Sequence, residues 1–417
     1  MKYLIYGDGI HDDYPGIQER IDNGGCELVL PPPAKCYLIS KTLVLPPHFR
    51  LVLPRFAEIR LADGADCLML RNRWRELPWS AENSVYEGRD RIWRFAEMIS
   101  PAPEDLCENI EVTGGIWNFN NKKQTPNPLA TQIFDDRFYT GFGMQFFNVR
   151  NLKLSDMTLK DPVTFAVTID LATDFTIENI TFDFNYGNPI ALNMDGIHID
   201  GNCHRGVIRN LKGACYDDLV ALNAYEGYAG PVTDIEIDGL FAEDCHSAVR
   251  LLALREKMER IHISNIYGTY YQYCVGISKF YRAEVTDGFD MVTIDNVYAS
   301  KAIRYTDRYP QKPTDRVYPL IWVQDGVILK NLTLRSIHRR ENNVPIETIS
   351  IGKCARPVEQ IIIEDVTVVN NTGTPTPVIL NRADIGTLHL SDIRSEEEIL
   401  KNEGTVGKLI ATGIPSL

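Results

Sequence analysis

A short motif recurs along this 417-residue chain between residues 149 and 393. It has an apolar residue, any residue, then Asn, Asp or Gly, and a second apolar residue. The nine copies are Val149–Leu152, Ile177–Ile180, Ile208–Leu211, Ile237–Leu240, Ile263–Ile266, Ile294–Val297, Leu329–Leu332, Ile363–Val366 and Leu390–Ile393. Their third positions are 28, 31, 29, 26, 31, 35, 34 and 27 residues apart. A constant motif at a variable period indicates similar strands joined by turns of unequal length, which is typical of a β-solenoid.

β-Propeller blades are the main competing architecture, because they also repeat short strands. They need hairpin turns, and the Asn-Gly and Asp-Gly pairs that such turns prefer are few in this chain. The asparagines of the motif are expected to be structural, since short amides stacked between coils can hydrogen-bond to their copies above and below. The sequence therefore predicts an all-β chain that forms a single parallel β-helix.

The two ends of the chain depart from the repeat. Residues 1–60 open with a helical pattern, Pro15–Ile21, followed by three short strands at 28–30, 37–39 and 43–45. A helix there would cap the first coil, which otherwise exposes its apolar interior. Asp12 and Asp13, just before the helix, fit helix-start chemistry better than a metal or catalytic site. Residues 395–417 are expected to form a C-terminal cap, with a short helix from Ser395 and a last strand.

Two polar insertions, 70–105 and 120–140, adjoin the main coils at 105–394. The first contains Trp74, Trp79 and Trp93 among six arginines. Such residues could wall a cleft that stacks on sugar rings and binds carboxylates, or they could form a self-packed surface excursion. The sequence leaves both interpretations open.

Composition limits the classes of partner. The net charge is -13, which argues against nucleic acid, because phosphate backbones select basic surfaces. No apolar stretch approaches the length of a membrane span, and the first residues lack the pattern of a signal peptide.

The nine cysteines include no Cys-x-x-Cys pair. Reduced thiols in a cytoplasm are therefore expected, although a trimmed secreted chain would look the same.

Three of the cysteines, Cys215, Cys245 and Cys274, are spaced by 30 and 29 residues, about one coil each. A three-thiolate metal site is one interpretation of this spacing. A column of small buried residues is the favoured one, because the spacing of coordination motifs is absent. We expect no metal and no cofactor.

Acidic residues and one histidine gather on three successive coils. Asp217 lies seven residues after Asn210, and His246 lies seven after Gly239, so equal offsets place them one above the other. An inserted turn at 185–189 accounts for the longer offset of Asp195. Asp218 follows Asp217 directly, so both can reach solvent only if the strand bends or ends there. Carboxylates in contact cannot all stay ionised, so one is expected to hold a proton and the others to orient water.

These residues stand in a recognisable order. Asn193-Met194-Asp195-Gly196, Asp217-Asp218 and His246 resemble the Asn-Thr-Asp, Asp-Asp and Gly-His-Gly patterns of the polygalacturonase-type glycoside hydrolases of family 28. The resemblance spans about residues 105–300 and implies a right-handed parallel β-helix of the pectin-lyase-like superfamily. It also implies that Asp217 is the general acid, that Asp195 and Asp218 activate the water, and that His246 tunes the cluster.

The sequence departs from the family where the substrate is bound. Met194 replaces the family's Thr, and the glycines beside the histidine are replaced by Cys245 and Ser247. Residues 275–279 occupy the place of the family's Arg-Ile-Lys, keeping Lys279 and losing the Arg. Arg250 or Arg282 could compensate. The predicted substrate-binding residues are therefore Asn193, Lys279, Arg250 and Arg282, and galacturonate at the cleavage site is in question.

The sequence thus predicts an enzyme, an inverting and exo-acting glycosidase on pectin-derived or related oligosaccharides. Two alternatives remain open. One is a polysaccharide lyase of the same solenoid class, which would use a Lys or Arg base and commonly Ca²⁺. The other is a tailspike-like solenoid that binds glycan without cutting it. The carboxyl spacing between coils would also suit a retaining enzyme, and inversion follows from the family resemblance. The sequence does not predict the oligomeric state.

Overall fold

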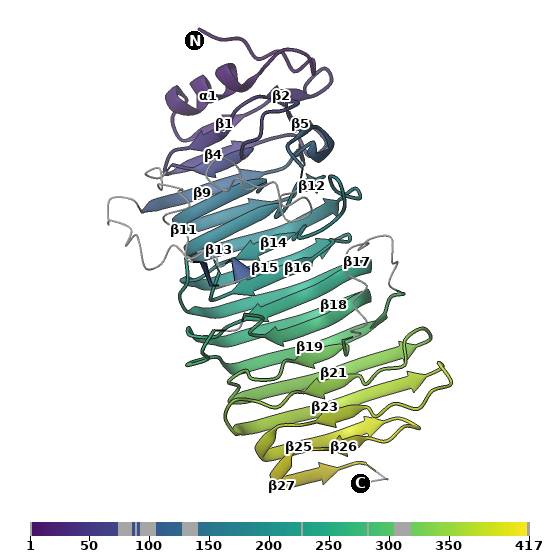
Figure 1. The fold of residues 1–417 in the computed structure, drawn as a ribbon. Coiled ribbons are helices and arrows are strands. Elements are labelled where there is room, and N and C mark those ends of the chain that lie inside the picture. The colour runs from purple at the N-terminus through teal and green to yellow at the C-terminus, as the bar shows by residue number, and fades with distance from the viewer. Residues whose placement is uncertain are drawn as a thin grey trace.

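The computed structural model describes residues 2–73, 86–87, 90–91, 106–126, 141–226, 228–281, 283–303 and 318–414. Its strands stack into an elongated right-handed parallel β-helix, with the N-terminus at one end and the C-terminus at the other (Figure 1). Residue pairing is parallel throughout this stack. The predicted fold class is therefore confirmed.

The longest of the three faces runs the whole length of the molecule. Its strands begin with β1 and end with β27: β1 (Glu27–Val29), β4 (Phe49–Val52), β9 (Cys107–Thr113), β11 (Met144–Ser155), β13 (Val167–Asp183), β15 (Cys203–Lys212), β17 (Val232–Leu252), β18 (Met258–Ser278), β19 (Phe289–Lys301), β21 (Asn331–Glu341), β23 (Val358–Asn370), β25 (Asp384–Arg394) and β27 (Thr405–Thr412).

A second face, called the site sheet below, carries the predicted catalytic residues. It is formed by β3 (Leu43–Leu45), β6 (Leu70–Asn72), the first residues of β11 and β13, β14 (Ile197–Ile199), β16 (Asp218–Asn223), the last residues of β17 and β18, β20 (Ile321–Val323), β22 (Ile349–Ile351), β24 (Ile379–Asn381) and β26 (Leu400–Asn402).

A third, shorter face is confined to the N-terminal half. It contains β2 (Tyr37–Ile39), β5 (Glu58–Leu61), β10 (Ile116–Asn118), β12 (Thr158–Lys160) and the end of β13. A 3-10 turn, η3 (Asn121–Lys123), follows β10, and β7 (Tyr86–Glu87) pairs with β8 (Asp90–Arg91) outside the stack. Residues 74–85, 88–89, 92–105 and 127–140 of the two insertions, including Trp74, Trp79 and Trp93, lie outside the described residues.

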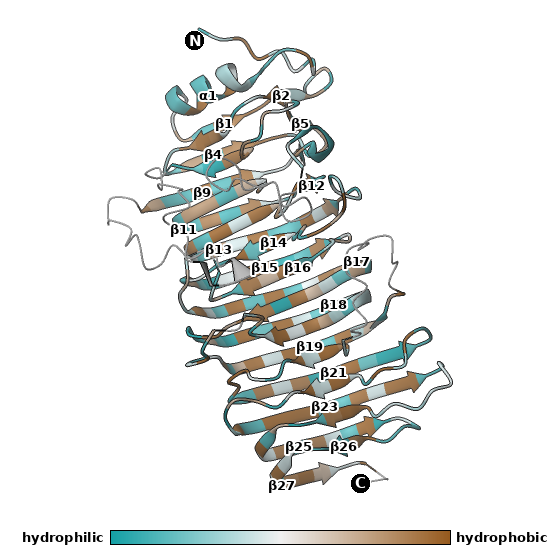
Figure 2. Ribbon diagram, viewed as in Figure 1, coloured by the Kyte–Doolittle hydropathy of each residue, from teal (hydrophilic) through white to brown (hydrophobic). Residues whose placement is uncertain are grey.

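Alternation of apolar and polar residues explains why these segments form strands. Inward positions are occupied by Ile, Val and Leu, so the apolar bands repeat from coil to coil (Figure 2). One inward column of the site sheet runs through Ile197, Val220, Val249 and Val275. All four side chains are fully buried. Burial of such continuous columns is the main stabilising contribution in a solenoid.

The motif asparagines lie at the corners, as expected. Asn179, Asn210, Asn265 and Asn296 adopt positive φ angles between 54° and 58°, which asparagine tolerates better than most residues. The Asn210 side-chain amide donates to Asn179 Oδ1 at 2.6 Å, and Asn296 donates to Asn265 in the same way. These amide ladders bear out their predicted structural role.

Two copies of the motif were assigned to the wrong position. Glu178 pairs with Ser155 and Asp295 with Arg335, so the residues aligned with this ladder are Asp156 and Ser336, not Asn151 and Asn331. Both have positive φ angles, of 58° and 49°. The error arose because Asn151 belongs to a neighbouring corner, and the sequence around Asn331 matches the motif within a strand.

The N-terminal helix confirms the predicted cap. Helix α1 (Tyr14–Asn23) buries Ile17 and Ile21 against the first coil. Asp13 stands at its N-cap position, yet its carboxylate accepts hydrogen bonds from the amides of Tyr6 and Leu38 and makes none to the helix. It therefore ties the N-terminal segment to β2.

The C-terminal end differs from its prediction. Residues 395–399 form a bend and no helix, because Glu397 accepts hydrogen bonds from Asn370 and Thr376 of the preceding coil. The expected last strand is present as β27, and its residues are largely exposed. No helix in the described ranges is long and apolar enough to cross a membrane.

Candidate active site

The four predicted catalytic residues meet at the N-terminal edge of the site sheet. Asp218 is the first residue of β16 and pairs with Ser247 of β17, so Asp217 and His246 precede this pair on adjacent coils. The amide of Gly196 donates to the Asp218 carbonyl at 3.0 Å, which places Asp195 on the coil before. Equal offsets in the sequence therefore identified true neighbours.

The chain bends before Asp218, as the sequence required. Tyr216 and Asp217 form a bend, and the strand starts only at Asp218. The alternation of a regular strand does not apply across that boundary, so the two carboxylates need not point to opposite faces. The Asp217 side chain is 18% exposed, while that of Asp218 is fully buried. The pairing of β17 with β18 shifts register on either side of Cys245, and such irregularities are common next to active sites.

Close packing between coils explains why the residue after Asp195 is a glycine, Gly196. A Cβ atom at this position would lie 2.6 Å from the Leu219 carbonyl oxygen and 2.8 Å from the Phe182 ring. Adjacent coils therefore approach too closely for any side chain here. This contact holds the turn that carries Asp195 against the start of β16.

Asp218 is surrounded by hydrogen-bond donors. Its Oδ1 accepts from the Ser247 hydroxyl and from the Tyr273 hydroxyl at 3.3 Å, and its Oδ2 lies 3.4 Å from Arg250 Nη1. Burial raises the pKa of Asp218 to about 6, against the opposing charge of Arg250. Donors aimed at both oxygens favour the ionised form near neutral pH.

Asp217 has a poorer set of partners. It pairs with His246, whose Nδ1 lies 3.4 Å from Asp217 Oδ1. His246 Nδ1 lies 3.0 Å from the Ser247 hydroxyl. The imidazole ring packs edge-on against Tyr271 and Tyr273. Burial raises the pKa of Asp217 to about 8, and the charge of Asp195 adds to the effect. Asp217 is therefore the carboxyl of the cluster that holds a proton at neutral pH.

Asp195 connects this cluster to a second group of ionisable residues. Its Oδ1 accepts from the Asp218 amide at 3.2 Å, and its Oδ2 lies 2.6 Å from His198 Nδ1. Burial raises the pKa of Asp195 to about 6, while the hydrogen bond with His198 opposes the rise. Asp195 and Asp218 thus lose their protons at a lower pH than Asp217 does.

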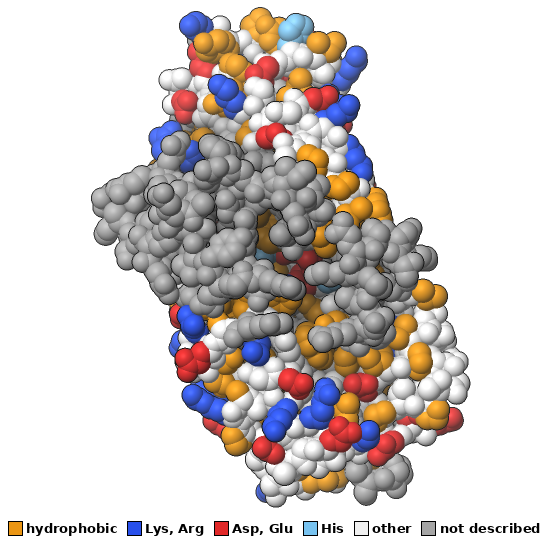
Figure 3. Space-filling model, viewed as in Figure 1, with side chains coloured by type: hydrophobic (Ala, Val, Ile, Leu, Met, Phe, Trp, Pro, Cys, Tyr) orange, Lys and Arg blue, Asp and Glu red, His pale blue; other side chains and the backbone are white. Residues whose placement is uncertain are grey.

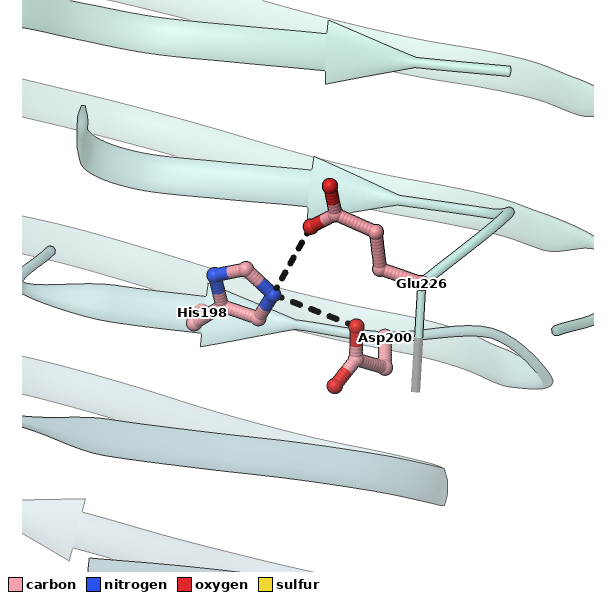
Figure 4. A group of neighbouring side chains, drawn as sticks. All are labelled: His198, Asp200 and Glu226. Carbon is pink, nitrogen blue, oxygen red and sulfur yellow. Dashed lines mark hydrogen bonds and ion pairs between the residues drawn. The ribbon is translucent and has the colours of Figure 1, made fainter. Parts of the chain in front are cut away.

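The second group consists of His198, Asp200 and Glu226, which the sequence prediction missed (Figure 4). His198 Nε2 lies 3.2 Å from Asp200 Oδ1 and 3.4 Å from Glu226 Oε2. The His198 ring stacks on Phe165 with 3.9 Å between centroids. Burial opposes a charge on His198, but the neighbouring carboxylates outweigh it and raise the pKa of the imidazole well above its usual value.

One signal in the sequence could have found His198. It alternates with Ile197 and Ile199 directly after Asp195, so a strand there turns it away from the core. No comparable signal exists for Glu226, which reaches the group from a turn after β16.

The predicted substrate-binding residues have different outcomes. Arg250 reaches the carboxylates and pairs in register with Gly276 on the next coil, within the segment 275–279 that stands in place of the family's Arg-Ile-Lys. Lys279 instead contacts the carbonyl of Tyr281 and the side chain of Gln324. Asn193 occupies a left-handed turn, with φ 55°. Arg282 lies outside the described residues. Substrate binding by any of the four stays a prediction.

Two groups in the described part of the chain have ligand atoms close enough to hold a metal ion. They are His198, Asp200 and Glu226, and Asp217, Asp218 and His246, and within each group the atoms lie within 4.8 Å of one another. The cysteine column is a structural one: Cys215, Cys245 and Cys274 are fully buried. Burial raises the pKa of the Cys245 thiol to about 12, so it stays neutral.

Comparison with known proteins identifies the central part of the chain. Residues 109–246 match the model of glycosyl hydrolases family 28. The resemblance seen in the motifs is thereby confirmed, and the matched stretch contains Asp195, Asp217 and Asp218 and ends at His246. A comparison with curated protein sequences found no match.

Solved structures share the fold at low sequence identity. The family 28 exopolygalacturonase of Yersinia enterocolitica is 13% identical, with a TM-score of 0.50 over 99% of this chain and 77% of that one. A tailspike protein of E. coli bacteriophage HK620, solved in complex with pentasaccharide, is 10% identical, with a TM-score of 0.55 over 98% of this chain and 76% of that one. These likenesses establish the β-helix.

Acidic and histidine side chains are visible together near the middle of the face in Figure 3. Elsewhere on that face, acidic and basic side chains are interspersed. The gathered carboxylates are therefore a local feature of the site sheet, in a chain whose net charge is -13.

Proposed function

We propose that the protein is a glycoside hydrolase that cleaves a glycosidic bond by acid-base catalysis. The observation that carries this proposal is the unequal protonation of neighbouring carboxyls. The pKa of Asp217 is raised to about 8, chiefly by burial, while Asp195 and Asp218 are held near 6. Between these values one carboxyl holds a proton and two are ionised, which is the division of roles that glycoside hydrolysis requires.

Each carboxyl then has a role set by its contacts. Asp217, the most exposed of the three, donates its proton to the leaving-group oxygen. Asp218 and Asp195 accept hydrogen bonds from fixed donors and orient the attacking water. His246 lies against Asp217 and adjusts the proton held there.

The proposed substrate is a pectin-derived or related oligosaccharide, attacked from a chain end. Arg250 supports recognition of an acidic sugar. Its Nη1 pairs with Asp218, its side chain is 16% exposed, and its buried Nε has no hydrogen-bond partner in the described part of the chain. A uronate carboxylate could pair with this guanidinium, since Arg binds carboxylates in a planar fork. The exo mode rests on the sequence-based expectation alone.

The stereochemical outcome is a separate part of the proposal. Ligand atoms of Asp217 and Asp218 lie within 4.8 Å, closer than the roughly 6.5–9.5 Å usual for inverting glycosidases. The family resemblance nevertheless implies inversion. In that case the water must approach between Asp195 and Asp218, opposite the bond that Asp217 protonates. NMR of the first-formed anomer decides between inversion and retention.

The test is to incubate the protein with oligogalacturonides and neutral plant oligosaccharides and to follow new reducing ends and unsaturated products. Saturated products shortened by one residue at a time would support an exo-acting hydrolase. Unsaturated ends that disappear on Ca²⁺ removal would replace the proposal with a lyase whose cation lies between Asp217, Asp218 and His246. Tight binding without either product would replace it with a glycan-binding solenoid.

A further inference from the structure

A second site lies beside the proposed catalytic carboxyls, at the opposite end of the same strands. His198 lies on β14, Asp200 directly follows that strand, and Glu226 follows β16 on the next coil. Their side chains converge on one point, which the Nε2 atom of His198 faces (Figure 4). The proposed roles of Asp217 and Asp218 do not use these groups.

The spacing of the three ligand atoms suits a small metal ion. His198 Nε2 is 3.2 Å from Asp200 Oδ1 and 3.4 Å from Glu226 Oε2. With metal–ligand bonds of about 2.0–2.1 Å, two ligands of a tetrahedral ion lie about 3.3–3.4 Å apart. The observed separations therefore leave room for one ion bound to all three side chains.

The neighbouring contacts hold each ligand in place. His198 Nδ1 lies 2.6 Å from Asp195 Oδ2, so a proton on Nδ1 leaves the Nε2 lone pair directed at the site. A carboxylate behind a metal-binding histidine is the usual arrangement in proteins. The Tyr281 hydroxyl donates to Glu226 Oε1 and leaves Oε2 turned toward His198. The ligands are thus oriented before any ion binds.

Asn223 offers a fourth ligand. It is fully buried, and its side-chain Oδ1 has no hydrogen-bond partner among the described residues. Its Nδ2 lies 3.0 Å from His198 Nε2 and 2.7 Å from Glu226 Oε2, so the amide belongs to the same point of convergence. A half-turn of the carboxamide would bring Oδ1 to the position of Nδ2. There the oxygen would face the ion as a fourth ligand, and the nitrogen would take the place that Oδ1 leaves.

The local charge also calls for a cation. Asp195, Asp200 and Glu226 contact His198, Asp170 acts on it electrostatically, and Arg250 is already paired with Asp218. Buried carboxylates are stable only when protonated, paired with cations or bound to metal. One divalent ion would balance two of them.

We propose that His198 Nε2, Asp200 Oδ1, Glu226 Oε2 and the side-chain oxygen of Asn223 bind a small divalent cation such as Zn²⁺ or Mn²⁺. An imidazole ligand and a small number of oxygens favour these ions over Ca²⁺, which takes six to eight oxygen ligands. The alternative occupant is a proton on His198. This inference goes beyond the proposed hydrolysis and does not depend on it.

The experiment uses the full chain stripped with a chelator, then titrated with ZnCl₂ and separately with MnCl₂ by calorimetry and thermal unfolding. We expect one saturable site per chain and a rise in melting temperature. Glu226→Gln and His198→Gln should each weaken that site at least tenfold, since even residues behind the ligands contribute tenfold or more. Asn223→Asp should tighten it at least tenfold, because it adds a charged ligand. This gain would be seen even if the other two variants failed to fold.

The matched controls are Asp217→Asn and His246→Gln, which alter the other group of close ligand atoms. They should retain the site with unchanged affinity. Loss of binding in these controls, unchanged binding in Glu226→Gln, or no saturable site would overturn the proposal. So would NMR showing both His198 ring nitrogens protonated at saturating metal. The titration contains no substrate, so it tests metal binding alone. Its result is independent of whether the protein hydrolyses a glycosidic bond.

Discussion

Replacement of Asp217 by Asn is expected to remove activity while making the folded protein more stable. The variant keeps the size of the side chain and loses the ionisable proton. A general acid contributes about 10²–10⁴-fold to the rate, so kcat should fall within that range. Asp218 and Asp195 keep their hydrogen bonds to Ser247 and to the Asp218 amide, and the fold should therefore persist.

The expected stability gain follows from the raised pKa of Asp217. The ordinary value of 3.8 becomes about 8 in the folded protein, because burial disfavours the charged form. The stability contribution of this carboxyl is therefore complete below pH 3.8 and is lost as the pH rises toward 8. The full loss amounts to roughly 6 kcal/mol at about 1.4 kcal/mol per tenfold change in proton affinity. Asn carries no such loss, but burying its carboxamide has a cost of its own, so the variant should gain on the order of 2–4 kcal/mol at pH 8 and little at pH 4.

The assay pairs single-turnover kinetics with urea unfolding at pH 4 and pH 8. Asp183→Asn serves as the control; this carboxylate is exposed and pairs with Lys160, so its loss should change neither rate nor stability by much. A variant within tenfold of the parent kcat would remove Asp217 as the acid. A variant less stable than the parent at pH 8 would show that the carboxyl is ionised and paired in the folded state.

Three further predictions follow from the same structure. The value of kcat/KM should fall below about pH 6, where Asp195 and Asp218 become protonated as a coupled pair, and above about pH 8, where Asp217 loses its proton. A flat profile from pH 5 to 9 would contradict these assignments. Gly196→Ala should lower the free energy of unfolding by about 1–3 kcal/mol or more, measured by urea, because its Cβ meets a carbonyl oxygen and an aromatic ring. Lys301 is fully buried, and burial lowers its pKa to about 7, so its stability contribution is present above pH 10.5 and is lost as the pH falls toward 7. Lys301→Met should therefore raise the free energy of unfolding by roughly 2 kcal/mol or more at pH 7 and by little at pH 10.5. Equal effects at the two pH values would refute this account.

The repeat made the fold predictable because a solenoid uses one local solution many times. A left-handed corner recurs in coil after coil, and Asn is the residue that best tolerates it. The prediction failed where another residue takes that corner, as Ser336 does, because Ser gives no distinctive signal. It also failed at residues 395–399, where a tertiary contact of Glu397 outweighed local helix preference.

The candidate site was predictable only where neighbouring coils have equal length. Asp217 and His246 follow their corners by the same number of residues, so their proximity could be read from spacing. Glu226 lies in a turn of irregular length, and no offset in the sequence relates it to His198. Ser247 and Tyr273 were missed for a different reason, since hydroxyl donors to a carboxylate are common residues without a motif.

Asp195 links the Asp217–Asp218–His246 group to the His198–Asp200–Glu226 group, so a change of charge in one group affects the other. One of its oxygens accepts from the Asp218 amide, and the other lies against His198. A charge gained or lost at His198 therefore acts on the carboxylate proposed to orient water, although His198 itself need not touch the substrate. If a metal ion replaces the proton on Nε2, the Nδ1 proton remains directed at Asp195, and this carboxylate keeps its position and its charge. The added positive charge should then move the acid limb of the pH profile, which belongs to Asp195 and Asp218, to lower pH.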